Sequence, residues 1–446
     1  FGDDMTLTEK LIELINVKPI TEDDLAATAW SVLDGLANTV AGTNSPQGRI
    51  LTEWFRAEAA DVNRTTLWLG GLMHILEVDD LHRQSVVHPG CVVIPATVAV
   101  GLREGASGRQ MLEAVLKGFE ACTRVGNSVG PSHYRLWHNT ATCGPFGGAY
   151  AAGSLLALDV RQLRDALGNA GTQSSGLWEF LDTGAMSKHL HAGRGAQSGV
   201  LAADLARLGF SGPPAILDGK RGFHAACCPD ADPDQLLADA VGPWQLHHTS
   251  IKPWPCCRHT HPAIDAALEL SGQVAPEAIA AIEVGATQAA LNICDRPTPE
   301  TLYDAKFSLQ HCTAIAVLDG KVEFDAFDPP AIKRTHPLRA KVRVRLSEPH
   351  DARYPEAWGG VVTVQLKDGT RRSAQREHAK GDPDAPVSPQ ELRDKAAMLL
   401  HHGGVAEPIP WIERILNLSE VASLQTSGLP ELLGLSGSKT EIPVAA

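Results

Sequence analysis

The 446-residue sequence lacks any apolar run of the roughly 18 residues that a membrane-spanning helix requires. Residues 1–20 carry acidic side chains early and have no basic stretch followed by an apolar core, so we expect no signal peptide. Basic residues are also scarce. The 39 Lys and Arg against 52 Asp and Glu give a formal net charge of −13, which argues against a nucleic-acid binder. An anionic substrate remains compatible, because a local cationic pocket can lie in an acidic protein.

Common cofactor and nucleophile motifs are missing as well. No Gly-x-Gly-x-x-Gly follows a predicted strand and no phosphate loop ends in Gly-Lys-Ser/Thr, so the sequence indicates no nucleotide cofactor. There is neither a Gly-x-Ser-x-Gly elbow nor a His-Glu-x-x-His motif. The nine cysteines are odd in number and include two vicinal pairs, which is not typical of a disulfide framework. We therefore expect a reduced, cytoplasmic protein.

A crowd of potential zinc ligands occurs at Cys256, Cys257, His259 and His261, with a histidine pair at 247–248 nearby. Structural zinc sites space their ligands by two to four residues and recruit a second pair at a distance, and no such second pair is evident. Adjacent cysteines also point in different directions in a strand or in a helix. The sequence therefore favours buried, apolar cysteines and no metal.

The composition is that of a globular protein, and the hydrophobic pattern differs between two parts of the chain. Hydrophobic residues make up 43% and charged residues 20%, which is enough to bury a sizeable core. Apolar residues recur at helical spacing over most of 6–250, whereas strand-like alternation appears between 278 and 375. A Pro- and Asp-rich stretch at 382–389 predicts a linker. We expect a mainly α protein with a large all-helical domain (1–251), a smaller α+β lid domain (252–386) and C-terminal helices (387–446) that return to the helical domain.

Four polar segments interrupt otherwise apolar stretches and hold the candidate site residues. They are 77–82 followed by His88, 136–142 with His138, 187–194 with Lys188, and 251–259 with Lys252. The second segment directly precedes a predicted Gly- and Ala-rich helix, whose N-terminal N–H groups and dipole suit a substrate carboxylate. In the last segment, a lysine beside prolyl and apolar groups at a domain junction could act as a base. Each segment is also compatible with an ordinary cap, solvated loop or hinge.

Taken together and in this order, the segments resemble the MmgE/PrpD family. The resemblance rests on Asp79-Asp80-Leu81-His82 to His88-Pro89-Gly90, Trp137-His138-Asn139-Thr140, Ser174–Leu181, Lys188-His189-Leu190-His191-Ala192-Gly193, Lys252–Arg258 and Asp304–Gln310. It covers nearly the whole chain. It implies a homodimer, a small di- or tricarboxylate substrate, and neither a metal nor an organic cofactor. The apolar helices predicted at 144–157 and 166–176 also favour a dimer, because they are hard to cover within one chain.

The resemblance further implies that Lys188, Lys252, His88 and His138 match active-site residues of the family. Two departures bear on the reaction. Where the family's dehydratases and decarboxylase read Asp-Phe-Asp-Asp-Thr, this chain reads Glu77-Val78-Asp79-Asp80-Leu81, and their tyrosine is His311 here. An imidazole in place of a phenol changes which protons can move near neutral pH. These changes favour removal of a proton and its return on the other face, as in the family's iminodisuccinate epimerases.

We therefore expect a cofactor-independent epimerase, an isomerase acting alpha to a carboxylate in an amino- or imino-dicarboxylate. The alternative is a hydro-lyase that dehydrates a hydroxy-tricarboxylate such as 2-methylcitrate, and a third possibility is a helical dimer that only binds carboxylates. The groups expected to transfer protons are Lys188, Lys252, His138 and His311. The groups expected to hold the substrate are His88, Asp79, Asp80, His191, Arg258 and Arg194.

Overall fold

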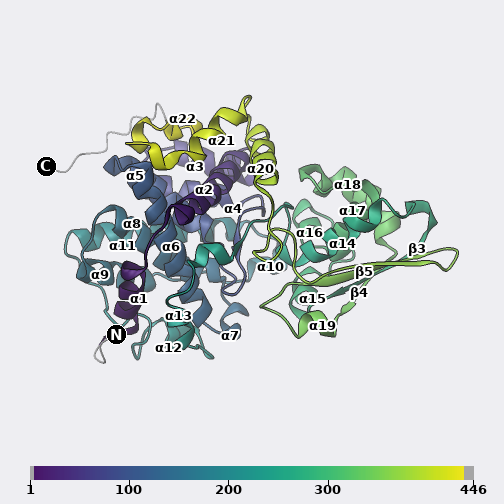
Figure 1. The fold of residues 1–446 in the computed structure, drawn as a ribbon, viewed down its shortest axis with the longest axis horizontal. Coiled ribbons are helices and arrows are strands. Elements are labelled where there is room, and N and C mark those ends of the chain that lie inside the picture. The colour runs from purple at the N-terminus through teal and green to yellow at the C-terminus, as the bar shows by residue number, and fades with distance from the viewer. Residues whose placement is uncertain (1–4, 436–446) are drawn as a thin grey trace. The chain divides into compact units, whose positions relative to one another are not determined.

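The computed structural model describes residues 5–435, and over that range the chain is mainly helical, as predicted. The chain forms two compact units (Figure 1). Unit one comprises residues 5–249 and 388–435 of the described chain, and unit two comprises residues 250–387. Within the described range, every helix falls short of the length and apolar character needed to cross a membrane.

Unit one consists of helices and one two-residue strand, β1. Local capping sets helix starts in this unit: Thr21 and Asp24 form a capping box at the start of α2, and Ser107 caps α6. The elements are α1 (Leu7–Val17), α2 (Glu22–Gly42), α3 (Pro46–Arg56), α4 (Val62–His74), β1 (Leu81–His82), α5 (Gly90–Glu104), α6 (Gly108–Ser128), α7 (Pro131–Tyr134), α8 (Asn139–Leu155), α9 (Val160–Gly171), α10 (Phe180–Thr183), α11 (Ser187–Arg207), α12 (Phe223–Cys227), α13 (Asp234–Leu237), α20 (Pro389–His402), α21 (Pro408–Leu416) and α22 (Leu429–Leu432).

Close packing of Gly- and Ala-rich helices forms the centre of unit one. Helix α8 packs against α5, α6, α9 and α11, and α11 also packs against α4. A side chain at Gly193 would collide with the carbonyl oxygen of Leu67, and one at Gly199 with the backbone at Gly148. These glycines therefore let α11 approach α4 and α8 closely, and the first turns of α5, α8 and α11 are held by a rigid core.

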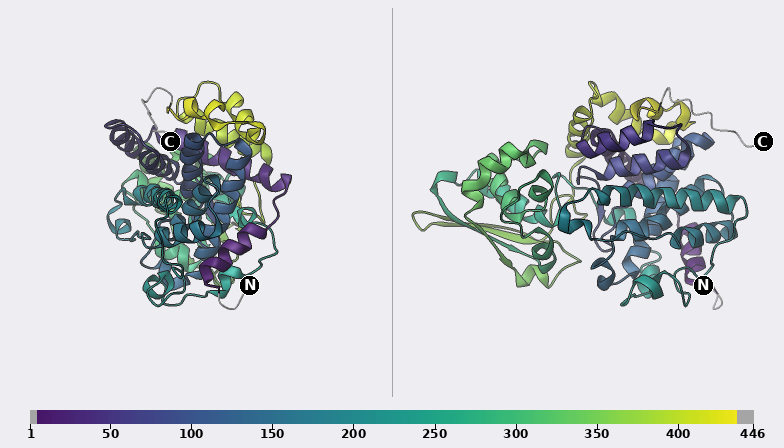
Figure 2. Two further views of the ribbon diagram at one scale, coloured as in Figure 1. Left: turned by 90° about the vertical axis from the view of Figure 1, so that its left-hand side faces the viewer. Right: turned by 180° about the vertical axis from the view of Figure 1, so that it is seen from behind.

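The C-terminal helices pack against the N-terminal part of unit one. In the ribbon views, the yellow helices lie beside the purple α2 from each side (Figures 1 and 2), and α20 and α21 both contact α2. From α20, the buried Lys395 reaches the carboxylate of Asp34 at 2.5 Å and the carbonyl oxygen of Val78 at 2.8 Å. This contact ties α20 to the loop that follows α4.

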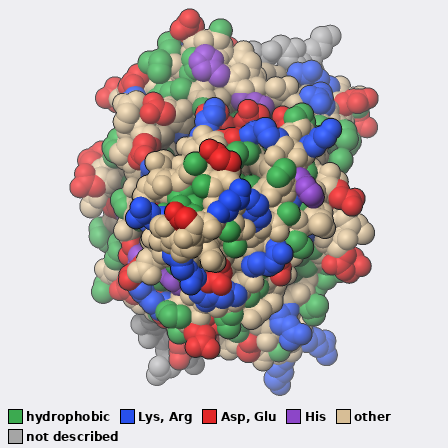
Figure 3. Space-filling view, turned by 90° about the vertical axis from the view of Figure 1, so that its right-hand side faces the viewer, with side chains coloured by type: hydrophobic (Ala, Val, Ile, Leu, Met, Phe, Trp, Pro, Cys, Tyr) green, Lys and Arg blue, Asp and Glu red, His purple; other side chains and the backbone are tan. Residues whose placement is uncertain are grey.

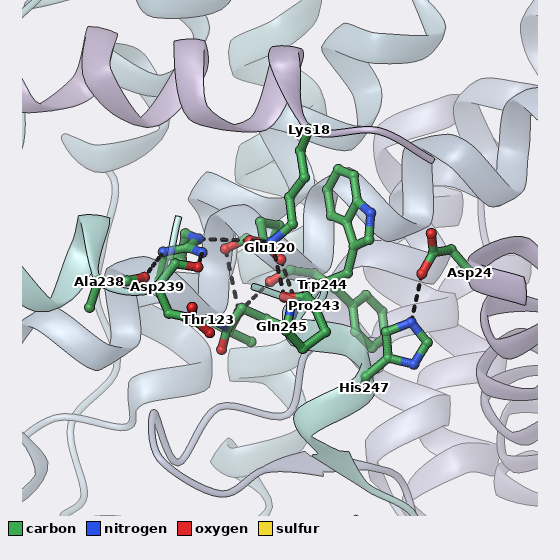
Figure 4. Close-up of polar contacts among 12 residues, drawn as sticks. Lys18, Asp24, Glu120, Thr123, Ala238, Asp239, Pro243, Trp244, Gln245 and His247 are labelled. Carbon is green, nitrogen blue, oxygen red and sulfur yellow. Dashed lines mark hydrogen bonds and ion pairs between the residues drawn. The ribbon is translucent and has the colours of Figure 1, made fainter. Parts of the chain in front are cut away.

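A buried ion network joins α6 to the end of α1 and to the segment around residues 236–245 in unit one (Figure 4). The carboxylate of Glu120 on α6 accepts hydrogen bonds from Lys18 at 2.9 Å, from Arg124 at 2.7 Å and from the backbone N–H of Gln245 at 2.6 Å. Arg124 in turn donates to the carbonyl oxygens of Leu236 and Ala238. Because these charged groups all have protein partners, we assign this network to stability rather than to ligand binding.

Unit two is the α+β part of the chain and carries a four-stranded mixed sheet. The sheet order is β4-β3-β5-β6, with β3 parallel to β4 and antiparallel to β5, and β5 antiparallel to β6. Helices α14 and α17 pack on the sheet and close its core. The elements are α14 (His261–Ser271), β3 (Ile279–Ala286), α15 (Gln288–Cys294), α16 (Leu302–Lys306), α17 (Leu309–Asp319), α18 (Pro329–Arg339), β4 (Val342–Leu346), α19 (Glu348–Asp351), β5 (Gly360–Leu366) and β6 (Arg371–Arg376). The two-residue strand β2 (Thr249–Ser250) has one residue in each unit.

Basic and acidic side chains are interspersed over the face shown in Figure 3, which presents no extended surface of one charge.

The stretch expected to be a linker begins with Asp382, which is fully buried and accepts hydrogen bonds from Ser250 and Arg258. Residue 382 is therefore an anchor within unit two, and only the residues after it can serve as a linker.

Candidate active site

The candidate site of unit one lies where the loop after α4 meets the first turns of α5, α8 and α11. The backbone N–H of His88, just before α5, donates to the hydroxyl of Thr140 in the first turn of α8 at 3.0 Å. His138 is the N-cap residue of α8, and its Nδ1 lies 3.4 Å from Nδ1 of His191 on α11. Three of the four predicted polar segments therefore come together in one place, with three helix N-termini directed toward it.

A buried ion pair joins two of these segments. The Nζ atom of Lys188 lies 2.6 Å from both carboxylate oxygens of Glu77, and both side chains are buried. Glu77 has a backbone φ of +61°, a conformation that residues other than glycine adopt rarely. Val86, later in the same loop, has a φ of +51°. Strained backbone of this kind clusters at functional sites, where the surrounding structure must hold it in place.

The two aspartates expected to hold substrate already have partners within the protein. Asp80 accepts the backbone N–H of Gly90 with both carboxylate oxygens at 3.1 Å, and so caps the start of α5. A β-carbon at Gly90 would lie 2.8 Å from Asp80, so glycine is needed there. Asp79 accepts a hydrogen bond from Nδ1 of His74 at 2.6 Å. Both aspartates therefore support the loop in this structure, and their role as substrate ligands stays a prediction.

Histidines form the main polar cluster of the site. We define the histidine cluster as His74, His88, His138 and His191. The ring centroids of His74 and His88 lie 4.7 Å apart, those of His74 and His138 5.8 Å, and those of His138 and His191 5.6 Å. His74 was missed at the sequence level, because it ends the apolar helix α4 and resembles a buried core residue. Its position three residues before Glu77, next to a predicted polar segment, is the sequence feature that could have identified it as a site residue.

Burial and neighbouring charge disfavour the protonated form of two imidazoles of the cluster, those of His138 and His191. The pKa of His138 lies well below its usual range, chiefly because burial disfavours the cation and then because of the charges of Lys188, His74, His191 and His88. Burial, His74 and Lys188 lower the pKa of His191 to about 4. The Nε2 atom of His138 is buried without a hydrogen-bond partner in the described structure. His138 can therefore accept a proton or a hydrogen bond from a ligand.

A cavity of about 720 Å³ adjoins the cluster within unit one. His191 lines it, together with Arg194 from the next turn of α11, and apolar walls come from Trp137, Phe180 and Leu190. Arg194 is exposed and donates to Gln197 at 2.6 Å, so its guanidinium retains further donors. The volume suits a small organic acid, and the lining places a cation beside an imidazole.

Three predicted site residues belong to unit two. Lys252 is 1% exposed at the start of that unit. The guanidinium of Arg258 is buried and donates to the carboxylate of Asp382 and to the carbonyl oxygens of Ala379 and Lys380. His311 places Nε2 2.8 Å from the carbonyl oxygen of Ala326 and Nδ1 3.1 Å from the Thr335 hydroxyl. Arg258 and His311 therefore have internal partners in this arrangement, and the site roles expected of them and of Lys252 stay predictions.

The crowd of cysteines and histidines in unit two is not arranged as a metal site. Cys256 contacts the Thr260 hydroxyl at 3.2 Å, and the ring of His259 stacks on Trp358 with centroids 4.3 Å apart. Across residues 5–435, the ligand-type atoms that do gather within 4.8 Å of one another belong to His74, Asp79 and Cys91 of unit one. That group includes His74 of the histidine cluster.

Comparison with known proteins extends over both units. Residues 10–236 match the model of the MmgE/PrpD N-terminal domain, and residues 254–408 match that of the MmgE/PrpD C-terminal domain. Cis-aconitate decarboxylase of Mus musculus is 24% identical over 93% of this chain and 91% of its own length, and that of Homo sapiens is 24% identical over 92% of each. Cis-aconitate decarboxylase of Aspergillus terreus is 29% identical over 44% of this chain and 43% of its own length. These relatives are named as decarboxylases, so the expectation of an epimerase receives no support from them.

Proposed function

The chain belongs to the MmgE/PrpD family, and on that premise we propose that it is a lyase acting on a small tricarboxylate without a cofactor. The observation that carries the proposal is the buried histidine cluster beside the Lys188 ammonium, at the first turns of three helices. The relatives named as cis-aconitate decarboxylases support a lyase over the epimerase favoured by the sequence alone. Decarboxylation of an unsaturated tricarboxylate of the cis-aconitate type is the first reaction to test.

The electrostatics of the site match a polyanionic substrate. Apart from burial, the causes that depress the pKa of His138 are all cationic charges, with Lys188 first among them. A bound tricarboxylate would offset those charges and raise the pKa of His138. The imidazole would then take up a proton when substrate binds. The site would thus acquire a proton donor in the presence of its anionic substrate.

The proposed chemistry uses that proton once. In decarboxylation, the bond between a carbon and its carboxylate breaks, CO₂ leaves with the carboxylate carbon, and the bonding electron pair stays on the carbon skeleton. One proton must then be added to that skeleton, and we assign its delivery to His138. The Lys188 ammonium would hold a carboxylate that remains and stabilise the charge that develops on it. Arg194 and His191 would bind a further carboxylate from the cavity side. Lys252 is kept as a second proposed proton-transfer residue.

Epimerisation of an imino- or amino-dicarboxylate is the second candidate. The observation that favours it is Leu81, a buried apolar residue at the position where the family's dehydratases and decarboxylase carry a threonine. That substitution removes a hydroxyl which could assist a leaving group, whereas epimerisation needs no leaving group. The partners of His311 count against it, because both ring nitrogens have contacts within unit two.

One experiment separates these candidates. The purified protein is incubated in heavy water with a panel of cis-aconitate, 2-methylcitrate, citrate and iminodisuccinate, and the products are followed by NMR. The proposal predicts a new alkene acid that carries one deuterium and is formed from a tricarboxylate. Deuterium uptake with inversion, seen only with iminodisuccinate, would transfer the assignment to the epimerase. Binding of a tricarboxylate without turnover of any member of the panel would leave a carboxylate-binding protein.

A further inference from the structure

His74 lies at the centre of the histidine cluster, and neither the sequence motifs nor the comparisons assign it a role. It is the last residue of α4 and is fully buried. Its Nδ1 lies 2.6 Å from the Oδ2 atom of Asp79, and its Nε2 has no hydrogen-bond partner in the described structure. Because a carboxylate only accepts hydrogen bonds, Nδ1 is the protonated nitrogen and donates. The orientation of the His74 ring is therefore set by Asp79.

Asp79 connects His74 to His88. The Oδ2 atom that accepts from His74 also lies 3.5 Å from Nδ1 of His88. The same Nδ1 of His88 lies 2.5 Å from the carbonyl oxygen of Asp80, so it carries a hydrogen and donates it to the backbone. A neutral His88 then presents Nε2 as its basic nitrogen. The carboxylate of Asp79 faces the protonated side of that ring, which is compatible with this tautomer.

We propose that His74 is a positioning residue: by donating to Asp79, it holds that carboxylate against the protonated side of the His88 ring, whose tautomer is set by the carbonyl oxygen of Asp80. His74 acts through Asp79, because its ring is fully buried and its one hydrogen bond is directed at that carboxylate. The rings of His74 and His88 also meet edge to face, with centroids 4.7 Å apart. A change of ring at position 74 therefore disturbs His88 through packing as well as through Asp79.

A metal ion is the competing explanation of the same residues. Ligand-type atoms of His74, Asp79 and Cys91 lie within 4.8 Å of one another. Two contacts favour the hydrogen-bonded arrangement. The 2.6 Å separation of His74 Nδ1 and Asp79 Oδ2 is a hydrogen-bond distance, shorter than the spacing of two ligands around one ion. The sulfur of Cys91 donates to the carbonyl oxygen of His88 at 3.2 Å, which requires the thiol rather than the thiolate that a metal binds.

The test compares two substitutions of the same residue. In His74→Asn, the amide nitrogen lies close to the former position of Nδ1 and can still donate to Asp79. In His74→Phe, a ring of similar size remains but the donor is lost. His401→Phe, at an exposed position on α20, is the matched control. All variants are first compared with the wild-type protein by thermal unfolding, so that only folded protein is examined further.

The primary readout needs no substrate, because the effect on turnover rests on the proposed function. In protein labelled with ¹⁵N-histidine, we expect the His88 nitrogens to report a protonated Nδ1 and an unprotonated Nε2 in the wild type, in His74→Asn and in His401→Phe. In His74→Phe, we expect the His88 nitrogen signals to shift, because Asp79 is no longer held against the ring, while the carbonyl oxygen of Asp80 keeps Nδ1 protonated. Unchanged His88 signals in His74→Phe would overturn the proposal. One equivalent of zinc in the purified protein, lost together with the His74–Asp79 contact in His74→Phe, would also overturn it.

Turnover is the second readout. With the substrate identified by the panel, we expect His74→Phe to lower kcat by about 10- to 100-fold, in the range seen for lost orienting partners, with little change in KM. His74→Asn should restore kcat to within about threefold of wild type. Equal losses in both variants would indicate a purely structural role. Failure of the whole panel would count against the proposed lyase, while the His88 nitrogen signals still decide the role of His74.

Discussion

The ammonium of Lys188 lies 2.6 Å from each carboxylate oxygen of Glu77, and the backbone of Glu77 has a φ of +61°. A left-handed backbone at a long side chain costs on the order of 1–3 kcal/mol and persists only where the surroundings hold it. The ion pair supplies one restraint on this loop. Lys395 supplies another from α20 by donating to the carbonyl oxygen of Val78, the next residue. The loop is thus held from two sides in the conformation that directs Glu77 toward Lys188.

Loss of the Lys188 ammonium should abolish most of the activity. We expect Lys188→Met to lower kcat/KM by at least ~10²-fold, because an acid–base or charge-stabilising group is lost. The same variant leaves the carboxylate of Glu77 buried without its partner, which should reduce the free energy of unfolding by about 3–5 kcal/mol. Steady-state kinetics and urea unfolding measure the two effects separately.

The double variant Lys188→Met with Glu77→Gln is the control for that experiment. It removes both charges, so we expect most of the lost stability to return while the activity stays low. Lys220→Ala, at an exposed lysine of unit one, should behave as wild type in both measurements. Recovery of activity in the double variant would show that Lys188 acts only through the stability of the loop.

Glu77→Asp tests the departure of this chain from the family pattern. Asp tolerates the left-handed region better than Glu, so the loop itself should be relieved of part of its strain. The carboxylate, however, retracts by one methylene from Lys188. We expect thermal stability within about 1 kcal/mol of wild type and a kcat reduced by about tenfold, because a small misplacement is costly at a reacting centre. Activity above wild type on cis-aconitate would instead mean that Asp is the better residue for that substrate.

Stability should fall as the pH drops below the usual histidine pKa of about 6.5. The pKa values of His82 and His259 are lowered to about 3, and those of His191 and His311 to about 4, mainly by burial. Between these values and 6.5, the unfolded chain binds protons that the folded chain does not. Each such histidine can therefore contribute up to about 1.4 kcal/mol of lost stability per pH unit. Urea unfolding at pH 7.5, 6.0 and 5.0 measures the loss.

His259→Phe is the matched variant for the pH series. It keeps a ring to stack on Trp358, where the wild-type centroids lie 4.3 Å apart, and removes a titrating group. We expect nearly wild-type stability at pH 7.5 and a shallower decline toward pH 5.0. If the free energies of unfolding of the wild type and of His259→Phe declined in parallel over the whole pH series, His259 would protonate freely in the folded protein, contrary to its burial.

The predicted homodimer is open to a direct measurement. The chain mass is 47.5 kDa, so sedimentation at micromolar concentration should give about twice that value. Part of the physical reason lies in apolar side chains that unit one leaves exposed near its cavity, among them Leu136, Leu177, Met186 and Leu190. Leu177→Asp combined with Leu190→Asp should shift a dimer toward the monomer if this surface is the interface. A wild-type monomer at that concentration would refute the dimer.

Local signals in the sequence set where several helices and one hairpin turn occur. The capping box of Thr21 and Asp24 and the cap at Ser107 are set by neighbouring residues, and α2 and α6 begin where those signals stand. The Asp368-Gly369 turn joins β5 to β6, because Gly369 adopts the positive φ of +88° that such a turn requires. Helix α8 is an exception, since it begins at Asn139 and makes His138 its N-cap, earlier than the Gly-rich run suggested.

By itself, the sequence determined the mainly helical class, the change from helical to strand-like hydrophobic patterns after residue 250 and the polar segments around His88, His138 and Lys188. Composition and short-range periodicity carry that information.

Only the tertiary structure decided which of these groups meet. Glu77 and Lys188 are 111 positions apart, and their contact follows from the close approach of α11 to α4 at Gly193. Arg258 was expected to hold the substrate and His311 to transfer protons, and the folded chain gives them internal hydrogen-bond partners in Asp382 and Ala326. Because a polar side chain takes whichever partner the folded chain brings within hydrogen-bond distance, residue type alone could not separate a site residue from a support, nor single out His74.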